Sequence, residues 1–329
     1  MLVLYTDGLI ERRDEVLDSG LGRLADAARR HGEATPDRLA TRLLDEMLAD
    51  TDQPDDVALI AVRVMPAPLD RRIPAESRQL SGVRRAVEAW ADQAALSAQT
   101  LEDLQLALGE AVANGVEHAY RGRAPGECAF RVAWQPDGAV EVAVQDYGTW
   151  RPPPADPGFR GRGLALMHSL GQDVHVEPAP GGGTTVRVRV APTADDAAGP
   201  DAPVVMGDLG GSGDASARLS THRGTGDGVV VAVSGELDLA SAEVLRPELL
   251  GVLAGLGTAS ATLDLRGTTY LASAGVGLLL EADAQARRAG LALRLLVRPG
   301  SSVARLLHVS RLDGVLTVDA VDAVEQPGG

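Results

Sequence analysis

Two breaks in the hydrophobic pattern divide this 329-residue chain and limit how it can fold. The longer break runs from about Pro192 to Ala217, is mostly Ala, Asp, Gly and Pro, and lacks hydrophobic periodicity, which is typical of a flexible linker. The shorter break is Met65–Pro68, where prolines follow an apolar run. A chain of this length predicts two or three domains. We therefore expect domains at 1–66, 70–192 and 219–322, with a flexible linker at 193–218.

Composition argues against several classes of protein. The chain has 31 basic and 46 acidic residues and a formal charge of −15, so its field repels phosphate and disfavours nucleic acid or an anionic membrane as the main partner. The single cysteine, Cys128, excludes a disulfide framework and a multi-cysteine metal site. No run approaches the ~20 apolar residues of a membrane helix, and the N-terminus lacks a signal-peptide pattern. We expect a cytoplasmic protein.

The expected elements differ among the three segments. The first reads as strand, helix, helix and strand, with Thr35 as the N-cap of its second helix. The second has helices near 77–96 and 101–119, then mostly strands, which indicates a two-layer α+β sandwich; its later elements are expected near 128–134, 139–145, 164–170 (a short helix), 173–177 and 184–190. The third alternates strands and helices from about 228 to 318, which predicts an α/β sheet covered by helices.

Four pieces of the second segment carry residue types suited to a nucleotide. On the helix near 101–119, Glu110, Asn114 and Glu117 share a polar stripe. A carboxylate there can take a proton from an attacking hydroxyl or water, and an amide oxygen suits Mg²⁺. Asp146 ends a strand, where it can accept from a purine amine. Glycines at 161 and 163 before a short helix let backbone N–H groups approach phosphate, and glycines at 181–183 open the last strand.

This order of motifs, over about residues 70–192, resembles the GHKL ATPase family, and specifically the anti-sigma-factor serine kinases. Glu110 and Asn114 fit the E-x-x-x-N of that family's first box. The resemblance implies that Glu110 is the general base, that Asn114 binds Mg²⁺, and that ATP is the phosphoryl donor.

The same resemblance implies roles for the remaining pieces. Asp146 and Gly148 fit the second box, with Asp146 on the adenine amino group, although Trp150 stands where the usual second glycine is expected. The other implied nucleotide-binding residues are Gly161 and Gly163 in the lid over the phosphates and Thr184 near the adenine.

The third segment resembles the STAS domain of anti-sigma-factor antagonists over about residues 219–322. Ser273 begins a predicted helix, where a serine is usually an N-cap, but where free N–H groups also accommodate an added phosphate. In that family the serine at this position is phosphorylated by the kinase described above, and Asp238 matches an acidic residue near it. The family often has Asp-Ser-Ser-Gly, whereas this chain has Ala-Ser-Ala-Gly at 272–275, so Ser273 is the implied phosphoacceptor.

The first segment resembles the final third of a metal-dependent, PPM-type serine phosphatase. The resemblance rests on LYTDGLIE at residues 4–11 and on Asp55-Asp56-Val57, and it implies Asp7 and Asp55 as vestigial Mn²⁺ or Mg²⁺ ligands. A two-metal site also needs carboxylates from an earlier part of that fold. We therefore expect no phosphatase activity from the chain as given, unless the native protein is longer.

Together these resemblances predict a partner-switching regulator of sigma-factor activity. In the main hypothesis the middle segment is an ATP-dependent serine kinase that phosphorylates a STAS protein or its own Ser273. Its expected partners are a sigma factor and a STAS antagonist, with a homodimer as a further option. Two alternatives remain: a non-catalytic nucleotide-binding scaffold that sequesters a sigma factor or antagonist, and a longer protein with an active phosphatase.

Overall fold

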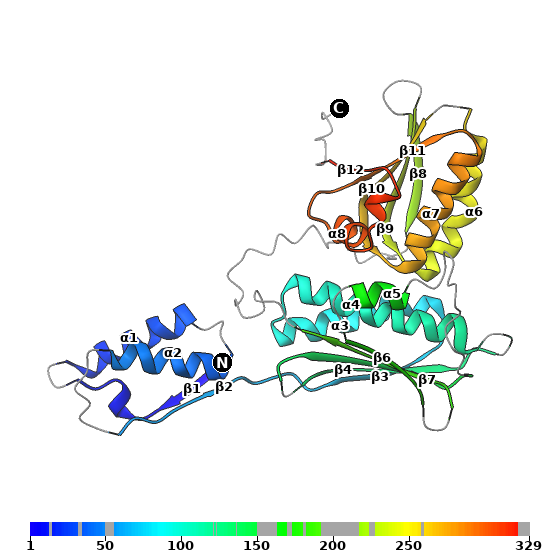
Figure 1. The fold of residues 1–329 in the computed structure, drawn as a ribbon. Helices are drawn as coiled ribbons and strands as arrows, with labels where there is room; N and C mark the ends of the chain where they lie inside the picture. The colour runs from blue at the N-terminus through cyan, green and yellow to red at the C-terminus, as the bar shows by residue number, and fades with distance from the viewer. Residues whose placement is uncertain are drawn as a thin grey trace.

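The computed structural model describes most of the chain. The described residues are 1–12, 15–31, 35–49, 56–120, 122, 124–135, 137–149, 163–169, 173–179, 182–191, 217–223, 228–257 and 260–321. They form an N-terminal unit, a central domain built from β3–β7 and α3–α5, and a C-terminal domain built from β8–β12 and α6–α8 (Figure 1). The fold class expected from the sequence, a multidomain α/β and α+β protein, is confirmed.

In the N-terminal unit two helices lie against a two-stranded sheet. β1 (Leu2–Tyr5) pairs antiparallel with β2 (Leu59–Val62), α1 (Leu17–His31) contacts α2 (Pro36–Leu48), and α2 contacts β2. Thr35 is the N-cap of α2, as predicted, and its hydroxyl accepts from the Arg38 amide at 3.4 Å. The small core contains Leu24 of α1 together with Leu39 and Leu43 of α2. The two α2 residues lie one helical turn apart and therefore share its buried face.

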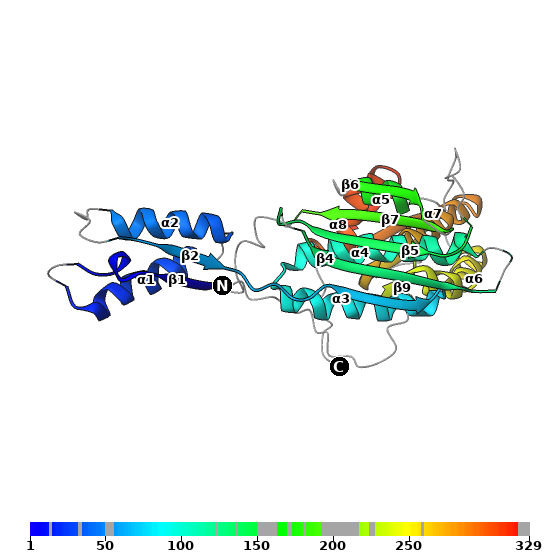
Figure 2. The ribbon, with the colours of Figure 1, turned by 90° about the horizontal axis from the view of Figure 1, so that it is seen from below.

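The central domain has helices on one face of an antiparallel sheet, ordered β3-β4-β5-β7-β6 (Figure 2). Alternate residues of β5 are buried, which is the pattern of a sheet covered on one face. The helices that cover this face are α3 and α4, with the short α5 beside α4. The bounds are β3 (Leu69–Pro74), α3 (Leu80–Ala94), α4 (Ala98–Asn114), β4 (Glu127–Trp134), β5 (Val140–Asp146), α5 (Gly163–Ser169), β6 (Asp173–Pro178) and β7 (Thr184–Val190).

The C-terminal domain has a five-stranded sheet ordered β12-β11-β10-β9-β8, parallel except for the antiparallel edge strand β8. In Figure 1, α6 and α7 lie on one face of this sheet and α8 on the other. The bounds are β8 (Arg218–Arg223), β9 (Val229–Leu237), α6 (Leu239–Gly255), β10 (Ser260–Leu271), α7 (Ser273–Arg288), β11 (Ala292–Val297), α8 (Ser302–Val309) and β12 (Val318–Ala320).

The sequence patterns missed two strands, and both lie at a sheet edge. β3 reads LDRRIP and β8 reads RLSTHR, and most of their side chains are exposed. An edge strand needs few apolar residues, so its sequence resembles a loop. Because β8 begins at Arg218, it also takes the last residue of the expected linker, while residues 193–216 lie outside the described part of the chain.

One predicted helix ends differently. The sequence indicated a continuous helix at 101–119, but α4 begins at Ala98, where Ser97 accepts from the Thr100 amide, and ends at Asn114. The next turn, Gly115–Ala119, is π-helical. Such turns insert extra backbone into a helix and frequently mark functional sites.

The central and C-terminal domains lie against each other (Figure 1). Both apolar and polar side chains cross their interface. Leu106 of α4 and Leu166 of α5 belong to the core of the C-terminal domain, and Leu239 of α6 belongs to the core of the central domain. The two cores are thus continuous across the interface. Among the described helices, none combines the length and apolar character needed to cross a bilayer.

Candidate active site

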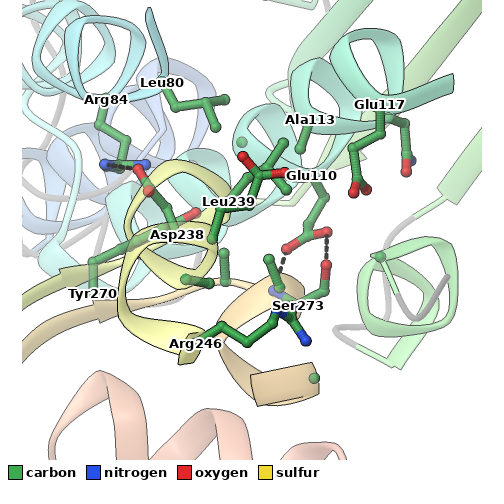
Figure 3. Close-up of a pocket in the computed structure, with 18 residues that line it drawn as sticks. Leu80, Arg84, Glu110, Ala113, Glu117, Asp238, Leu239, Arg246, Tyr270 and Ser273 are labelled. Atoms are coloured by element: carbon green, nitrogen blue, oxygen red, sulfur yellow. Dashed lines mark hydrogen bonds and ion pairs between the residues drawn. The ribbon is translucent and has the colours of Figure 1, made fainter. Parts of the chain in front are cut away.

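Glu110 and Ser273 meet at the interface of the two domains. The Ser273 hydroxyl donates to Glu110 Oε2 at 2.5 Å, and the Ser273 backbone N–H donates to Glu110 Oε1 at 2.6 Å (Figure 3). Glu110 lies on the fourth turn of α4 and is 2% exposed, whereas Ser273 is the first residue of α7. The residue expected as a base and the residue expected as a phosphoacceptor therefore share two hydrogen bonds.

The contact explains why Ser273 does not cap its helix. The N-cap of α7 is Ala272, without a side-chain hydrogen bond, so the ordinary role of a serine at a helix start does not apply here. Instead, the first free N–H of α7 and the serine hydroxyl both point at the Glu110 carboxylate. An anion at a helix N-terminus is stabilised by these unpaired N–H groups.

A narrow cavity of about 40 Å³ opens beside this contact. Asn114 and Glu117, which follow Glu110 along the same helix, line it together with Gly163 at the start of α5. Figure 3 shows Glu117 beside Glu110. A Cβ atom on Gly163 would overlap Glu110 Oε2, so only glycine lets the backbone of α5 approach the carboxylate. The structure thus brings together Glu110, Asn114 and Gly163, three of the residues for which the sequence predicts a nucleotide site.

Burial changes the pKa of the Glu110 carboxyl group. Loss of solvent raises its pKa above the ordinary glutamate value, and the two hydrogen bonds from Ser273 act in the opposite direction but do not cancel the effect. Glu117 adds a smaller upward contribution because the two carboxylates repel each other. A carboxylate with a raised pKa has the greater proton affinity that a general base requires.

Asp146, Gly148 and Thr184 form a second group at the ends of adjacent strands. They do not line the cavity beside Glu110; Asp146 is buried at the end of β5 and accepts from the Gly148 amide at 2.9 Å. Gln145 pairs with Thr185, so Thr184 lies one step further along β7, on the same face as buried Val186. The π-helical turn joins the two groups, because Gly115 follows Asn114 and lies directly against Asp146.

Two glycines fix how closely this second group packs. A Cβ atom on Gly183, whose φ is +90°, would overlap the Asp146 carbonyl, and one on Gly148 would overlap the Ala119 carbonyl. Both positions therefore require a residue without a side chain. Of the glycines expected to open the last strand, Gly183 therefore serves the close packing of the strand end around Asp146.

Two predicted site residues, Gly161 and Asp55, lie outside the described residues. Asp7 is described: its Oδ1 accepts from the Gly8 amide at 3.0 Å, and the neighbouring Thr6 hydroxyl donates to the Asp56 carbonyl at 3.1 Å. The structure thus places the segment after Asp55 beside Asp7. Within the described residues, no three His, Cys, Asp or Glu side chains gather closely enough to hold a metal ion.

Sequence reasoning missed Arg84, the most deeply buried cation of the interface. Arg84 of α3 is 3% exposed and pairs with Asp238 at 2.6 Å and with Glu236. Its guanidinium lies 4.4 Å from the centre of the Tyr270 ring. A signal was available, because Arg84 interrupts an apolar helical stripe formed by Leu80, Val83 and Val87.

The structure explains why an aspartate stands at position 238 and a glycine at position 109, which the sequence did not reveal. Asp238 is the N-cap of α6 and forms a capping box with Ser241 in addition to its ion pair with Arg84. Gly109 lies inside α4, where glycine weakens a helix. A Cβ atom there would be only 2.6 Å from the Tyr270 hydroxyl, so the glycine makes room for the C-terminal domain.

Comparison with protein families assigns each part of the chain. A model described as "Histidine kinase-like ATPase domain" matches residues 73–190. One described as "Mlab, STAS domain" matches residues 220–318, and "Stage II sporulation protein E (SpoIIE)" matches residues 1–65.

Individual relatives resemble the central domain. The serine-protein kinase RsbW of Listeria monocytogenes serovar 1/2a is 35% identical over 78 residues, which are 24% of this chain and 49% of the relative. RsbW of Bacillus velezensis is 34% identical over 80 residues, with shares of 24% and 49%. The chain thus spans about half the length of the curated relatives it matches.

Solved structures show similarity over larger parts of the chain. The RsbU and RsbW domains of Rv1364c from Mycobacterium tuberculosis are 28% identical and cover 58% of this chain and 52% of that one, with a TM-score of 0.35. An anti-sigma factor antagonist from Mycobacterium paratuberculosis is 23% identical and covers 33% of this chain and 91% of that one, with a TM-score of 0.30. With the family matches in chain order, the protein consists of a SpoIIE-like segment, a histidine-kinase-like ATPase domain similar to RsbW, and a C-terminal STAS domain.

Proposed function

We propose that this chain is a partner-switching regulator whose ATPase domain is a serine kinase and whose own STAS domain is its substrate. One observation carries the proposal: Ser273 Oγ donates a hydrogen bond to buried Glu110 Oε2 at 2.5 Å. A nucleophile held within hydrogen-bond distance of a carboxylate is the arrangement that general-base catalysis needs. The similarity to serine-protein kinases of the RsbW type supports the same reaction.

Each partner in the contact has a defined task. Glu110 Oε2 takes the hydroxyl proton of Ser273, which makes Oγ the nucleophile. Glu110 Oε1 holds the Ser273 backbone N–H, which fixes the start of α7 and keeps the hydroxyl in place. Such positioning and charge stabilisation account for most of the catalysis in phosphoryl transfer.

The residues around the contact suit a magnesium nucleotide. When bound, MgATP would supply the γ-phosphoryl group that Ser273 Oγ accepts, and the bond to the β-phosphate would break to leave ADP. The side-chain oxygen of Asn114 lines the cavity beside Glu110 and is the type of ligand Mg²⁺ prefers. The buried acceptor Asp146 would select the adenine amino group, with Gly148 and Thr184 beside it, and Gly161 and Gly163 would cover the phosphates.

The proposed partners follow from the two domains. Because the ATPase domain is similar to the serine-protein kinase RsbW, we propose that it binds a sigma factor through the face that its own STAS domain covers in this structure. Phosphate on Ser273 would stand against the Glu110 carboxylate, and the like charges would repel. Transfer would therefore release the STAS domain from the face that it covers.

Substitution of Ser273 tests the proposed reaction. With labelled ATP, the unmodified chain should acquire phosphate on Ser273, located by peptide mass spectrometry, and Ser273→Ala should lose that label. Nucleotide binding measured by calorimetry should persist in both proteins, because Ser273 is not among the proposed nucleotide ligands. ATP binding by the unmodified chain without transfer to any STAS serine would favour the scaffold alternative, and undiminished label in Ser273→Ala would identify another acceptor.

Acid should slow the transfer at a higher pH than an ordinary glutamate would allow. Burial raises the pKa of Glu110. As the pH falls, its carboxylate therefore takes up a proton at a pH above the ordinary glutamate pKa of ~4.3, and it can then no longer accept the serine proton. The rate should thus be high above the raised pKa and fall as the pH drops through it. Single-turnover labelling between about pH 5 and pH 8 measures this limb. A rate that stays constant when the pH is lowered further, through the ordinary glutamate value of ~4.3, would argue against Glu110 as the base.

A further inference from the structure

A second group of ion pairs crosses the interface, and its polarity is opposite to that of the Arg84 group. Arg84 places a cation of the ATPase domain against Glu236 and Asp238 of the STAS domain. At the start of α8, Arg305 places a cation of the STAS domain against acids of the ATPase domain. Its guanidinium lies 3.3 Å from Glu102 and also pairs with Asp103. Each domain thus contributes one arginine and one pair of carboxylates to the ion pairs across the interface.

The Arg305 group is partly removed from water. The Asp103 side chain is 11% exposed, and the side chains of Arg305 and Glu102 are about one-third exposed, at 32% and 39%. The Gln99 side chain, from the preceding turn of α4, joins this group, because its amide oxygen accepts from Arg305 Nε at 3.0 Å. If Arg305 were replaced by an acid, or an acid of this group by a base, like charges would face each other. Little water could enter to screen their repulsion.

Apolar packing does not fill the region between the two groups. A cavity of about 250 Å³ separates them and is lined by residues of both, including Arg84, Glu236, Glu102 and Arg305. Leu106 and Leu306 also line this cavity and pack in one apolar cluster, so apolar contacts hold the domains together there while the charged pairs on either side require matching surfaces. Complementary charges fix register and reject wrong partners more than they add affinity.

We propose that the Arg305 group, with Glu102 and Asp103, selects which STAS domain docks on the ATPase domain. This inference rests on the proposed function, because docking brings Ser273 to Glu110. The fitting partner is a STAS domain with acids at the end of the strand equivalent to β9 and an arginine in the first turn of the helix equivalent to α8. This chain and a second copy of it meet both conditions, and a STAS domain with an acid at position 305 would be rejected.

Two full-length chains with complementary defects test the selection. An enzyme chain carries Ser273→Ala and keeps Glu110, while an acceptor chain carries Glu110→Gln and keeps Ser273; labelled ATP then reports transfer between chains. Arg305→Glu in the acceptor should lower its labelling about tenfold, because the reversed charge meets Glu102 and Asp103. The same substitution in the enzyme chain should raise labelling of an unreversed acceptor, because it loosens the STAS domain already docked there.

A charge swap and a matched control complete the design. Glu102→Arg with Asp103→Asn in the enzyme chain should restore labelling of the Arg305→Glu acceptor and weaken labelling of the unreversed one. Arg294→Glu makes the same charge change in the STAS domain, at the exposed pair with Asp319, and should alter labelling in neither chain. Because the restoring changes lie in the other domain, recovery would exclude misfolding of the reversed acceptor.

The outcomes separate this inference from the proposed function. If the unmodified chain does not label its own Ser273, the proposed kinase function fails. If it does, but Arg305→Glu and Arg294→Glu acceptors are labelled equally, or the swap restores nothing, selection by Arg305 is wrong. An Arg305→Glu enzyme chain that labels no acceptor would also overturn it, because a loosened contact should expose the face.

Discussion

Glu110→Gln is expected to lower the rate of phosphate transfer to Ser273 by about 10²- to 10⁴-fold, the usual contribution of a general base. The amide has nearly the shape of the carboxylate and its oxygen can still accept one hydrogen bond from Ser273. It cannot take a proton at neutral pH, so the hydroxyl would attack without its base. Single-turnover labelling of Ser273 with saturating ATP measures the chemical step directly.

The matched control for this variant is Glu117→Gln. It removes the same charge from the same cavity but leaves both hydrogen bonds between Glu110 and Ser273. Its expected loss of rate is far smaller. Equal losses in the two variants would show that the cavity needs negative charge and would contradict proton acceptance by Glu110. Thermal unfolding should reveal no destabilised fold in Glu110→Gln, because a neutral amide is easier to bury than a carboxylate.

Gly183→Ala is expected to destabilise the strand ends around Asp146 by about 2–5 kcal/mol, the combined cost of a strained φ and a steric overlap. The residue has φ +90°, which alanine rarely adopts, and its new Cβ atom would overlap the Asp146 carbonyl. Strand β7 or Asp146 would have to move. Since Asp146 is the proposed adenine acceptor, the affinity for ATP should fall in parallel.

Gly138→Ala separates the two causes. Gly138, in the turn between β4 and β5, has a similar φ of +85°, but nothing lies within 4 Å of its added Cβ atom. This control should show the strain alone and leave ATP affinity unchanged. Hydrogen exchange of peptides from β5 and β7 measures the local loss, and calorimetry measures the affinity. Equal effects of the two substitutions would mean that the contact between Gly183 and Asp146 is unimportant.

Local sequence patterns were reliable where burial on one face creates a clear period. The alternating residues of β5 and the apolar stripe of α2 identified those elements, and the E-x-x-x-N spacing correctly placed Glu110 and Asn114 on one helical face. The patterns failed for β3 and β8, whose polar residues at sheet edges bury little surface. They also missed the π-helical turn after Asn114, because no periodicity distinguishes it from ordinary helix.

The amino-acid sequence by itself determined the three kinds of domain, the face of α4 that carries Glu110 and Asn114, and Ser273 at the start of a helix. Only the tertiary structure decided that this serine meets this carboxylate, because the two residues are 163 positions apart and touch only when the domains dock. Arg84, Gly109 and Arg305 lie where the two domains meet, and nothing in the local sequence predicts the residues that they contact. Their roles depend on the oppositely charged or bulky side chains that face them across the interface. Local periodicity contains no information about neighbours so distant in the sequence.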